Sequence, residues 1–215
     1  MNAYAPAPAP VSYIYCDDHL ILIDKPSGLL SVPGRGFEKT DCAIARVQSE
    51  FPDALTVHRL DMATSGLLLM ARGKDMQRAL SGFFERGEVE KAYLADVWGA
   101  PSPTRGEIDL PLITDWPNRP LQKVDHDIGK PSRTLYETLS VQNGHARLKL
   151  TPLTGRSHQL RVHLATIGHP ILGDEFYATG EALAARPRLA LHAALLAFVH
   201  PATDERMEFE APCPF

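Results

Sequence analysis

The chain has 215 residues, of which 44% are hydrophobic and 22% charged, and its formal net charge is -4 at pH 7. These values are ordinary for a soluble globular protein, and the length allows one large domain or one domain with two lobes. No window approaches the run of apolar residues that a membrane-spanning helix needs, so no membrane association is expected. The three cysteines, Cys16, Cys42 and Cys213, form no CxxC pair. This excludes a zinc ribbon or a disulfide framework and favours reduced thiols in the cytoplasm.

Residues 1–10 are rich in Ala and Pro and contain no Lys or Arg. They lack the basic start and the apolar run of a signal peptide, so we expect a short flexible leader. One folded domain is then expected over residues 11–215.

In the first half of the chain, alternating and continuous apolar residues predict strands over 12–16, 20–23 and 66–71. Asp17 and Asp18 form the turn between the first two strands. A helix is predicted over 41–50 with Asp41 as its cap, because Ile44 and Val47 fall on one face. A second helix is predicted over 74–86, with Gly87 as its end.

In the second half, strands are predicted over 89–98, 106–113, 133–141, 146–153, 187–199 and 206–209. Asn143-Gly144 lies between two of them and favours a tight hairpin. A last helix is predicted over 157–167, with Leu160, Leu164 and Ile167 on one face. Strands outnumber helices and the hairpin is antiparallel, which indicates an α+β fold with a mixed, mainly antiparallel sheet and flanking helices.

The densest polar cluster is the segment 58–66, which precedes a buried apolar strand. A strand can hold such a cluster rigidly, as active sites require. If the segment is extended, Arg59 and Asp61 point to one face and His58 to the other. The alternative is an Arg–Asp pair on a surface loop, and the chemistry of the residues alone leaves it open.

A second cluster covers residues 154–161. Gly155 allows a sharp turn, and Arg156 lies where the third helix is predicted to start. Main-chain N–H groups and a guanidinium at a helix start suit an anion, either a phosphate or a carboxylate. A structural helix start capped by Ser157 remains an equal alternative.

Basic residues are concentrated between positions 119 and 161 in spite of the acidic net charge. They are Arg119, Lys123, Lys130, Arg133, Arg147, Lys149, Arg156 and Arg161. Binding of nucleic acid depends on the local field, so a basic face is compatible with this composition. A scatter of solvated charges is the alternative.

Metal and cofactor motifs are missing from the sequence. His158 and His163 are five residues apart, not the four that place two ligands on one helix face. Residues 64–66, Thr-Ser-Gly, are not a nucleophile elbow, and neither a Walker A loop nor a GxGxxG motif occurs. We therefore expect neither a metal nor a cofactor.

The segment 58–72, HRLDMATSGLLLMAR, resembles the signature of the RluA family of pseudouridine synthases. Further pieces follow the family's order: DKPSGL (24–29), KAYLA leading to VWG (91–99), GKP (129–131), LTGRSHQLRVH (153–163), GHPILGD (168–174) and RLALHA (188–193). The resemblance extends from about residue 14 to residue 209. It implies the pseudouridine synthase catalytic fold, with an active-site cleft across the sheet.

The resemblance also implies roles for individual residues. Asp61 matches the nucleophilic aspartate, Tyr93 the aromatic against the target base, and Arg156 the arginine that pairs with the aspartate. Expected RNA contacts are Arg59, Lys91, Arg161, Lys123 and Lys130, where Arg59 matches the arginine that fills the gap left by the base. Expected supporting residues are His58, Thr64 and His192.

Many members of the family carry an N-terminal S4 domain, and none is expected here because the catalytic pattern starts almost at once. The segment 111–120 resembles a short member that acts on both the tRNA anticodon stem-loop and 23S rRNA. A cytoplasmic monomer acting on both RNAs is therefore expected. One alternative is an inactive RNA-binding or RNA-folding module, and another is a nucleoside hydrolase or glycosidase. The second would need another catalytic carboxylate or a metal cluster.

Overall fold

The computed structural model describes residues 4–34, 36 and 39–215, and they form two compact units. Unit 1 contains the described residues up to Lys91 together with Ala193–Pro214, and unit 2 contains Ala92–His192 and Phe215. The boundaries after Lys91 and after His192 fall within strands. In the described part of the chain, no helix has the length and apolar character needed to cross a membrane.

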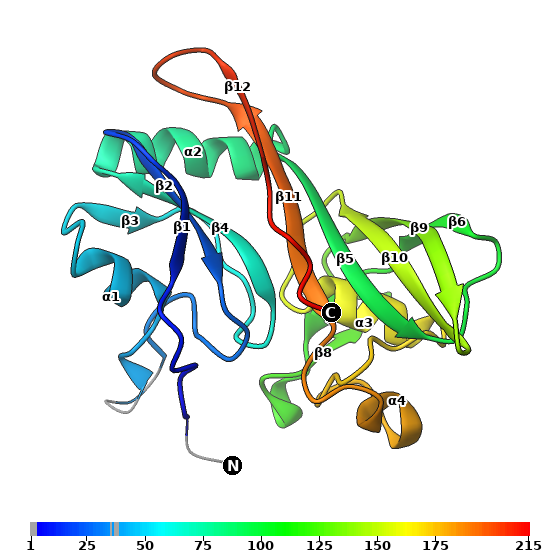
Figure 1. Ribbon diagram of the computed structural model, residues 1–215. Coiled ribbons are helices and arrows are strands. Elements are labelled where there is room, and N and C mark those ends of the chain that lie inside the picture. Colours follow the sequence, from blue (N-terminus) through cyan, green and yellow to red (C-terminus); the bar gives the residue numbers. More distant parts are fainter. Residues whose placement is uncertain (1–3, 35, 37–38) are drawn as a thin grey trace. The chain divides into compact units, whose positions relative to one another are not determined.

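Unit 1 is a sheet flanked by two helices (Figure 1). Its strands lie in the order β1 (Ser12–Cys16), β2 (Leu20–Lys25), β4 (Ser65–Arg72) and β11 (Leu191–Val199), while β3 (Ala54–Thr56) pairs with β4 and β12 (Arg206–Glu210) with β11. The pairs β1–β2, β2–β4, β3–β4 and β11–β12 are antiparallel. The strands predicted over 12–16, 20–23, 66–71 and 206–209 are thereby confirmed.

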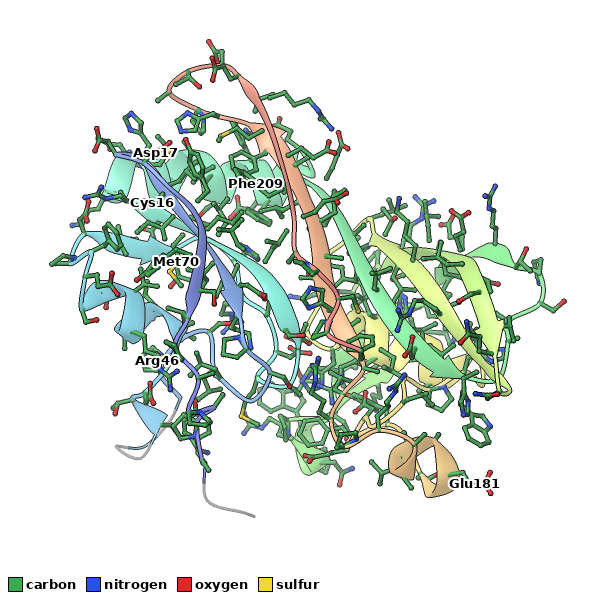
Figure 2. The ribbon with its side chains drawn as sticks, in the orientation of Figure 1. Cys16, Asp17, Arg46, Met70, Glu181 and Phe209 are labelled. Atoms are coloured by element: carbon green, nitrogen blue, oxygen red, sulfur yellow. The ribbon has the colours of Figure 1, made fainter. Side chains whose placement is uncertain are left out.

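The predicted turn between β1 and β2 is closed by Asp17. Its Oδ1 accepts hydrogen bonds from the N–H groups of His19 at 2.7 Å and Leu20 at 2.8 Å. Figure 2 shows Asp17 beside Cys16 at the end of β1. A side-chain oxygen that satisfies two main-chain donors stabilises such a turn.

The core of unit 1 lies between β4 and α2 (Lys74–Arg86). β4 is buried on both faces, as the continuous apolar run predicted. Leu80 of α2 is fully buried in this core, and Phe83 and Phe84 pack against it. The helix ends at Gly87, whose left-handed φ of 74° suits a residue without Cβ. Both predicted ends of this helix are confirmed.

The first helix is shorter than predicted. α1 spans Ala43–Gln48, and its N-cap is Cys42 without a side-chain cap bond. Asp41 instead accepts hydrogen bonds from Arg46 at 2.7 and 2.8 Å, so its predicted capping role is wrong. The same arginine, labelled in Figure 2, donates to the carbonyls of Ala7 and Ala9, at 2.8 and 2.7 Å.

Gly66, near the start of β4, marks a close approach of two main chains. Its φ is 110°, and a Cβ built on it would lie 2.3 Å from the carbonyl oxygen of Ala193. No side chain fits there, so β4 and β11 can approach only through glycine. This contact fixes the strand that directly follows the Asp61 segment.

Unit 2 contains a second run of strands, in the order β5 (Glu90–Trp98), β10 (His145–Pro152), β9 (Arg133–Gln142) and β6 (Arg105–Asp109). These neighbours pair antiparallel, and an isolated bridge between Gly99 and His145 is parallel. The turn between β9 and β10 has positive φ at Asn143 (52°) and Gly144 (77°), as the predicted tight hairpin requires. The predicted fold class, α+β with a mixed and mainly antiparallel sheet, is confirmed.

Several element boundaries in unit 2 differ from the prediction. The strand predicted over 106–113 is two strands, β6 and β7 (Leu112–Thr114), because Pro111 between them lacks the N–H that a ladder needs. β11 starts at Leu191, not at 187. Three short elements were not predicted: β8 (Gln122–Val124), the 3-10 turn Trp116–Asn118 and α4 (Gly180–Ala184).

The third helix also starts later than predicted. α3 spans Gln159–Thr166 and follows His158, whose φ of 54° lies in the left-handed region. Ser157 is therefore outside the helix and does not cap it. Arg156 lies in a turn ahead of the helix and is not the first residue of the helix.

Candidate active site

The candidate site residues belong to both units. Unit 1 contains His58, Arg59, Asp61, Thr64 and Lys91. Unit 2 contains Tyr93, Lys123, Lys130, Arg156, Arg161 and His192.

Asp61 lies in a loop whose main chain is held on both sides. Ser31 Oγ donates to the Leu60 carbonyl at 2.7 Å and accepts from the Leu60 N–H at 3.0 Å. Ser27 Oγ donates to the Ala63 carbonyl at 2.7 Å. Hydroxyl groups from an earlier loop thereby fix Leu60, which precedes Asp61, and Ala63, which follows it by two positions. Such preorganisation is what a catalytic side chain needs.

Lys25 provides the third attachment of this loop. Its ammonium is fully buried and donates to the carbonyls of Pro26 at 3.0 Å, Leu29 at 2.7 Å and Met62 at 3.1 Å. The Gly28 N–H also donates to the Met62 carbonyl, at 2.8 Å. A buried charge is tolerated only where its donors are satisfied, and here three carbonyls satisfy them. The lysine thus connects its own turn to the residue that follows Asp61.

His58 supports the loop from the other end. Its Nε2 accepts a hydrogen bond from the Leu69 N–H at 2.9 Å, so this nitrogen carries no proton. Its ring stacks on Phe84 of α2, with centroids 4.3 Å apart. Burial lowers the pKa of His58 to about 3, with a smaller contribution from the Lys91 ammonium. His58 is therefore neutral at physiological pH and unsuited to proton transfer there.

The low pKa of His58 predicts a loss of stability on acidification. The unfolded chain binds a proton to this ring below about pH 6.5 while the folded chain stays neutral, so the stabilising contribution is present above the unfolded pKa and lost as pH falls toward 3. Between pH 7.5 and 5 we expect a loss of about 2 kcal/mol from this residue. Urea unfolding of the wild type and of His58→Gln, which keeps an acceptor, measures the difference. Equal pH slopes for the two proteins would contradict the assignment.

The remaining unit 1 residues differ in exposure. Thr64 is buried, and its N–H donates to the Asp61 carbonyl at 3.1 Å, which closes a turn around the carboxylate. Arg59 is exposed, and among the described residues no carboxylate lies within ion-pair distance of it. Lys91 Nζ lies 5.9 Å from the ring centroid of Phe84, and burial lowers the pKa of this lysine.

In unit 2, Gln159 organises the loop that carries Arg156. Its Oε1 accepts from the Arg156 N–H at 3.0 Å and from Thr154 Oγ1 at 2.7 Å. Its Nε2 donates to the Arg133 carbonyl at 2.9 Å and to Thr134 Oγ1 at 3.0 Å. All four contacts use a single amide that is only 4% exposed. The turn before α3 is therefore tied to the start of β9.

We expect Gln159→Leu to lower kcat about 10- to 100-fold, because the arginine loop loses its fixed position. Unfolding stability should fall by roughly 2 kcal/mol, since buried donors and acceptors are left without this partner. Single-turnover assays and urea unfolding measure the two effects. Gln142→Leu, at the exposed end of β9, is the matched control. Wild-type turnover by a folded Gln159→Leu protein would show that the loop is ordered without the amide.

Arg161 is not presented at the surface. It is 3% exposed, and its guanidinium makes two hydrogen bonds to the buried carboxylate of Asp174, at 2.8 and 2.6 Å. The guanidinium carbon also lies 4.9 Å from the ring centroid of Phe176. This corrects the sequence-based expectation that Arg161 contacts RNA. Its geometry is that of a structural ion pair inside unit 2.

The basic stretch from 119 to 161 is less exposed than its composition suggests. Arg133 pairs with Glu107, Arg147 with Asp96 and Arg161 with Asp174. Lys123 lies 3.6 Å from Asp125. Arg119, Lys130 and Lys149 are exposed, and the part of the chain described contains no carboxylate within ion-pair distance of them. The basic face is thus smaller than expected.

Two further residues lie on the strands that cross the unit boundaries. Tyr93 is on β5, where its register partner is Leu150 of β10. His192 is on β11 and is fully buried, which suits a supporting residue better than a chemical one.

Arg156 is exposed, and its Nε donates to the Pro131 carbonyl at 3.3 Å.

The sequence of the chain matches the model of a known protein family. Residues 19–166 match the family described as RNA pseudouridylate synthase. The chain belongs to the RNA pseudouridylate synthase family. The matched range includes Asp61, Tyr93 and Arg156, and the resemblance inferred from the ordered motifs is confirmed.

Individual relatives of this synthase agree over its whole length. The dual-specificity RNA pseudouridine synthase RluA of Escherichia coli K12 is 52% identical over 217 residues, covering 100% of this chain and 99% of the relative. The RluA of Yersinia pestis is 51% identical over 203 residues, covering 94% and 98%. Among solved structures, human RNA pseudouridylate synthase domain containing 1 has a TM-score of 0.77 at 29% identity, covering 95% of this chain and 84% of that one.

Sequence reasoning about this synthase missed the residues that hold the site in place. Lys25, Ser27, Ser31 and Gln159 carry the loops of Asp61 and Arg156. Lys25, Ser27 and Gln159 lie in ordered motifs that were recognised, but no local pattern shows which distant carbonyl a side chain reaches. Lys or Gln at a motif position where a buried residue is expected is a signal that could have identified Lys25 and Gln159.

Proposed function

We propose that this chain converts specific uridines to pseudouridine in structured RNA loops, in both the tRNA anticodon stem-loop and a 23S rRNA hairpin, with Asp61 as its catalytic carboxylate. The observation that carries the proposal is the Asp61 loop, whose carbonyls at Leu60, Met62 and Ala63 are held by three side chains of one earlier segment. The dual specificity printed in the names of the RluA relatives supports two RNA substrates.

The reaction explains why one carboxylate is enough. The bond from C1′ to N1 breaks, the uracil turns, and C1′ joins C5. The proton on C5 leaves and N1 gains a proton, so nothing is oxidised or reduced and no water is consumed. A glycosidase needs a second carboxylate to protonate its leaving group. A departing uracil can carry negative charge itself, which removes that requirement.

Tyr93 and Arg156 complete the proposed chemistry. Tyr93 offers a flat face for the released uracil and a hydroxyl for late removal of the C5 proton. Arg156 stands at the position of the arginine that pairs with the catalytic aspartate in this family, and a guanidinium is suited to grip a carboxylate with two parallel hydrogen bonds. The Arg156 N–H donates to Gln159, which fixes the main chain of this exposed loop. A fixed loop agrees with the role proposed for Arg156.

Arg59 has a separate role in the proposal. The target base must leave its stack, which costs a few kcal/mol and is least costly in a loop. Arg59 is exposed and has no carboxylate partner among the residues described, so its planar guanidinium is free to occupy the vacated place. This mode suits unpaired loops, which are the usual targets of specific RNA recognition.

We further propose that the protein works as a cytoplasmic monomer. The sequence contains three cysteines and no CxxC pair, which suits a reducing compartment. The inactive alternative is disfavoured because Asp61, Tyr93 and Arg156 all stand at the positions that the family motifs give them.

The test uses transcripts of an anticodon stem-loop and of a 23S rRNA hairpin labelled with tritium at C5 of uridine. Formation of the C1′–C5 bond releases the label to water, so catalysis is read directly as released tritium. We expect release from both RNAs, at one position in each. No release from either RNA would overturn the enzymatic assignment. Release from one RNA alone would overturn the dual specificity and leave the chemistry intact.

A further inference from the structure

The hairpin β7–β8 in unit 2 carries an ordered tip. β7 pairs antiparallel with β8, and residues 115–121 connect them. The Asp115 N–H donates to the Leu121 carbonyl at 2.9 Å, and the Leu121 N–H donates to the Asn118 carbonyl at 3.1 Å. Asn118 Nδ2 donates to Asp115 Oδ2 at 2.8 Å. The tip is therefore a built turn and not a loose connection.

Trp116 on this tip is exposed to an extent that packing does not explain. It is 63% exposed, and among the large apolar side chains described only Ile128 exposes a greater share. Tryptophan normally buries most of its large apolar surface. A tryptophan held outward by an ordered turn suggests a surface that contacts a flat partner.

Arg119 places a guanidinium on the same tip. Its guanidinium carbon lies 4.3 Å from the ring centroid of Trp116. Asp115 is the nearest acid in sequence, but its Oδ2 already accepts from Asn118. The exposed Lys123 of β8 adds a charge that is partly balanced by Asp125, 3.6 Å away. An aromatic face beside a guanidinium is the combination that binds a nucleobase together with its phosphate.

A hydrogen-bond chain connects the hairpin to the loop of the catalytic arginine. Tyr177 OH accepts from the Gln122 N–H at 2.9 Å and lies 2.7 Å from His158 Nδ1, to which it can donate. His158 is two residues after Arg156. A nucleotide on the hairpin tip would thus be held in a defined position relative to that loop.

We propose that Trp116 and Arg119 form a stacking platform for an unpaired nucleotide of the RNA substrate, outside the target uridine, with Arg119 and Lys123 contacting its phosphates. The inference rests on the proposed function, and it adds a residue that determines substrate affinity. An RNA base is the occupant that fits, because the platform is flat, aromatic and cationic, whereas a protein partner would favour a broader apolar surface.

The first test is the kinetics of Trp116→Ala on the anticodon stem-loop. Stacking of one base is worth about 1–3 kcal/mol, so we expect KM to rise roughly 5- to 150-fold with kcat within twofold of wild type. Trp116→Phe should recover most of the affinity. Leu139→Ala is the matched control, because Leu139 is 50% exposed on β9 and lies outside the hairpin. An unchanged KM for Trp116→Ala, as a protein-binding tip would give, overturns the proposal.

An abasic scan identifies the stacked nucleotide. Removing that base should raise KM for the wild type but not for Trp116→Ala, since the partner is already gone. If each abasic position affects the two proteins equally, no base stacks on Trp116 and the proposal is wrong.

A binding assay separates this inference from the enzymatic assignment. The chain has two tryptophans, so Trp98→Phe leaves Trp116 as the only indole. Stacking of a base should quench its fluorescence on titration with the stem-loop. Quenching without tritium release would support the platform and contradict the proposed function. Tritium release without quenching would support the proposed function and contradict the platform.

Discussion

Asp61→Asn is expected to lower pseudouridine formation by at least about 10³-fold while the protein stays folded and binds RNA. Asn has the same shape, and the hydrogen bonds that hold the loop involve main-chain atoms of Leu60, Met62 and Ala63. The substitution therefore replaces the carboxylate by an amide and leaves these main-chain contacts in place. Release of tritium from C5-labelled stem-loops measures the loss, and urea unfolding checks the fold.

The control for this variant is another carboxylate of unit 1. Asp75 on α2 is fully solvated apart from its pair with Arg78, so Asp75→Asn should keep wild-type turnover. Turnover by Asp61→Asn within tenfold of the wild type would exclude Asp61 as the essential group. An equal loss in both variants would point to a general electrostatic effect.

Lys25→Met is expected to have the second large effect, on stability and turnover together. It removes the donor to the buried carbonyl of Leu29 and the partly buried carbonyls of Pro26 and Met62, and each unsatisfied buried group costs about 1–3 kcal/mol. Because the Gly28 N–H still serves the Met62 carbonyl, we expect a total loss of roughly 3 kcal/mol. The kcat should fall about 10- to 100-fold in the protein that remains folded, because the loop after Asp61 loses an attachment.

Urea unfolding and single-turnover kinetics at low temperature separate the two effects of Lys25→Met. Lys74→Met is the matched control, since Lys74 is exposed at the start of α2. Lys25→Arg should be intermediate, because it keeps the charge but changes the donor geometry. A stable Lys25→Met protein with wild-type kcat would show that the ammonium does not position the loop.

The elements that could be predicted from the sequence are those with local causes. α2 has an apolar stripe and a terminal Gly87, and both of its ends were predicted. The β9–β10 hairpin follows from Asn143 and Gly144, which adopt the positive φ values that its turn needs. The start of α3 could not be predicted, because the left-handed conformation of His158 has no local signal.

The site shows the same division between local and distant causes. Asp61 was identified because its signature is contiguous in sequence. The residues that hold its loop were not identified, because they are distant in sequence. Ser31 reaches Leu60 from 29 residues away, and Lys25 reaches Met62 from 37 residues away. Arg161 was misassigned because α3 is buried from Gln159 to Leu164, so no periodicity separates an inner from an outer face.

The division of unit 1 along the chain has a consequence for its synthesis. The core that packs on β4 includes Leu196, Phe198 and Ala211, which follow Ala92–His192 of unit 2 in the chain. Until they have been synthesised, β4 lacks these contacts and Gly66 lacks its close neighbour Ala193, although β2 already pairs with β4. The scaffold that carries the Asp61 loop is therefore completed only after unit 2 has been synthesised.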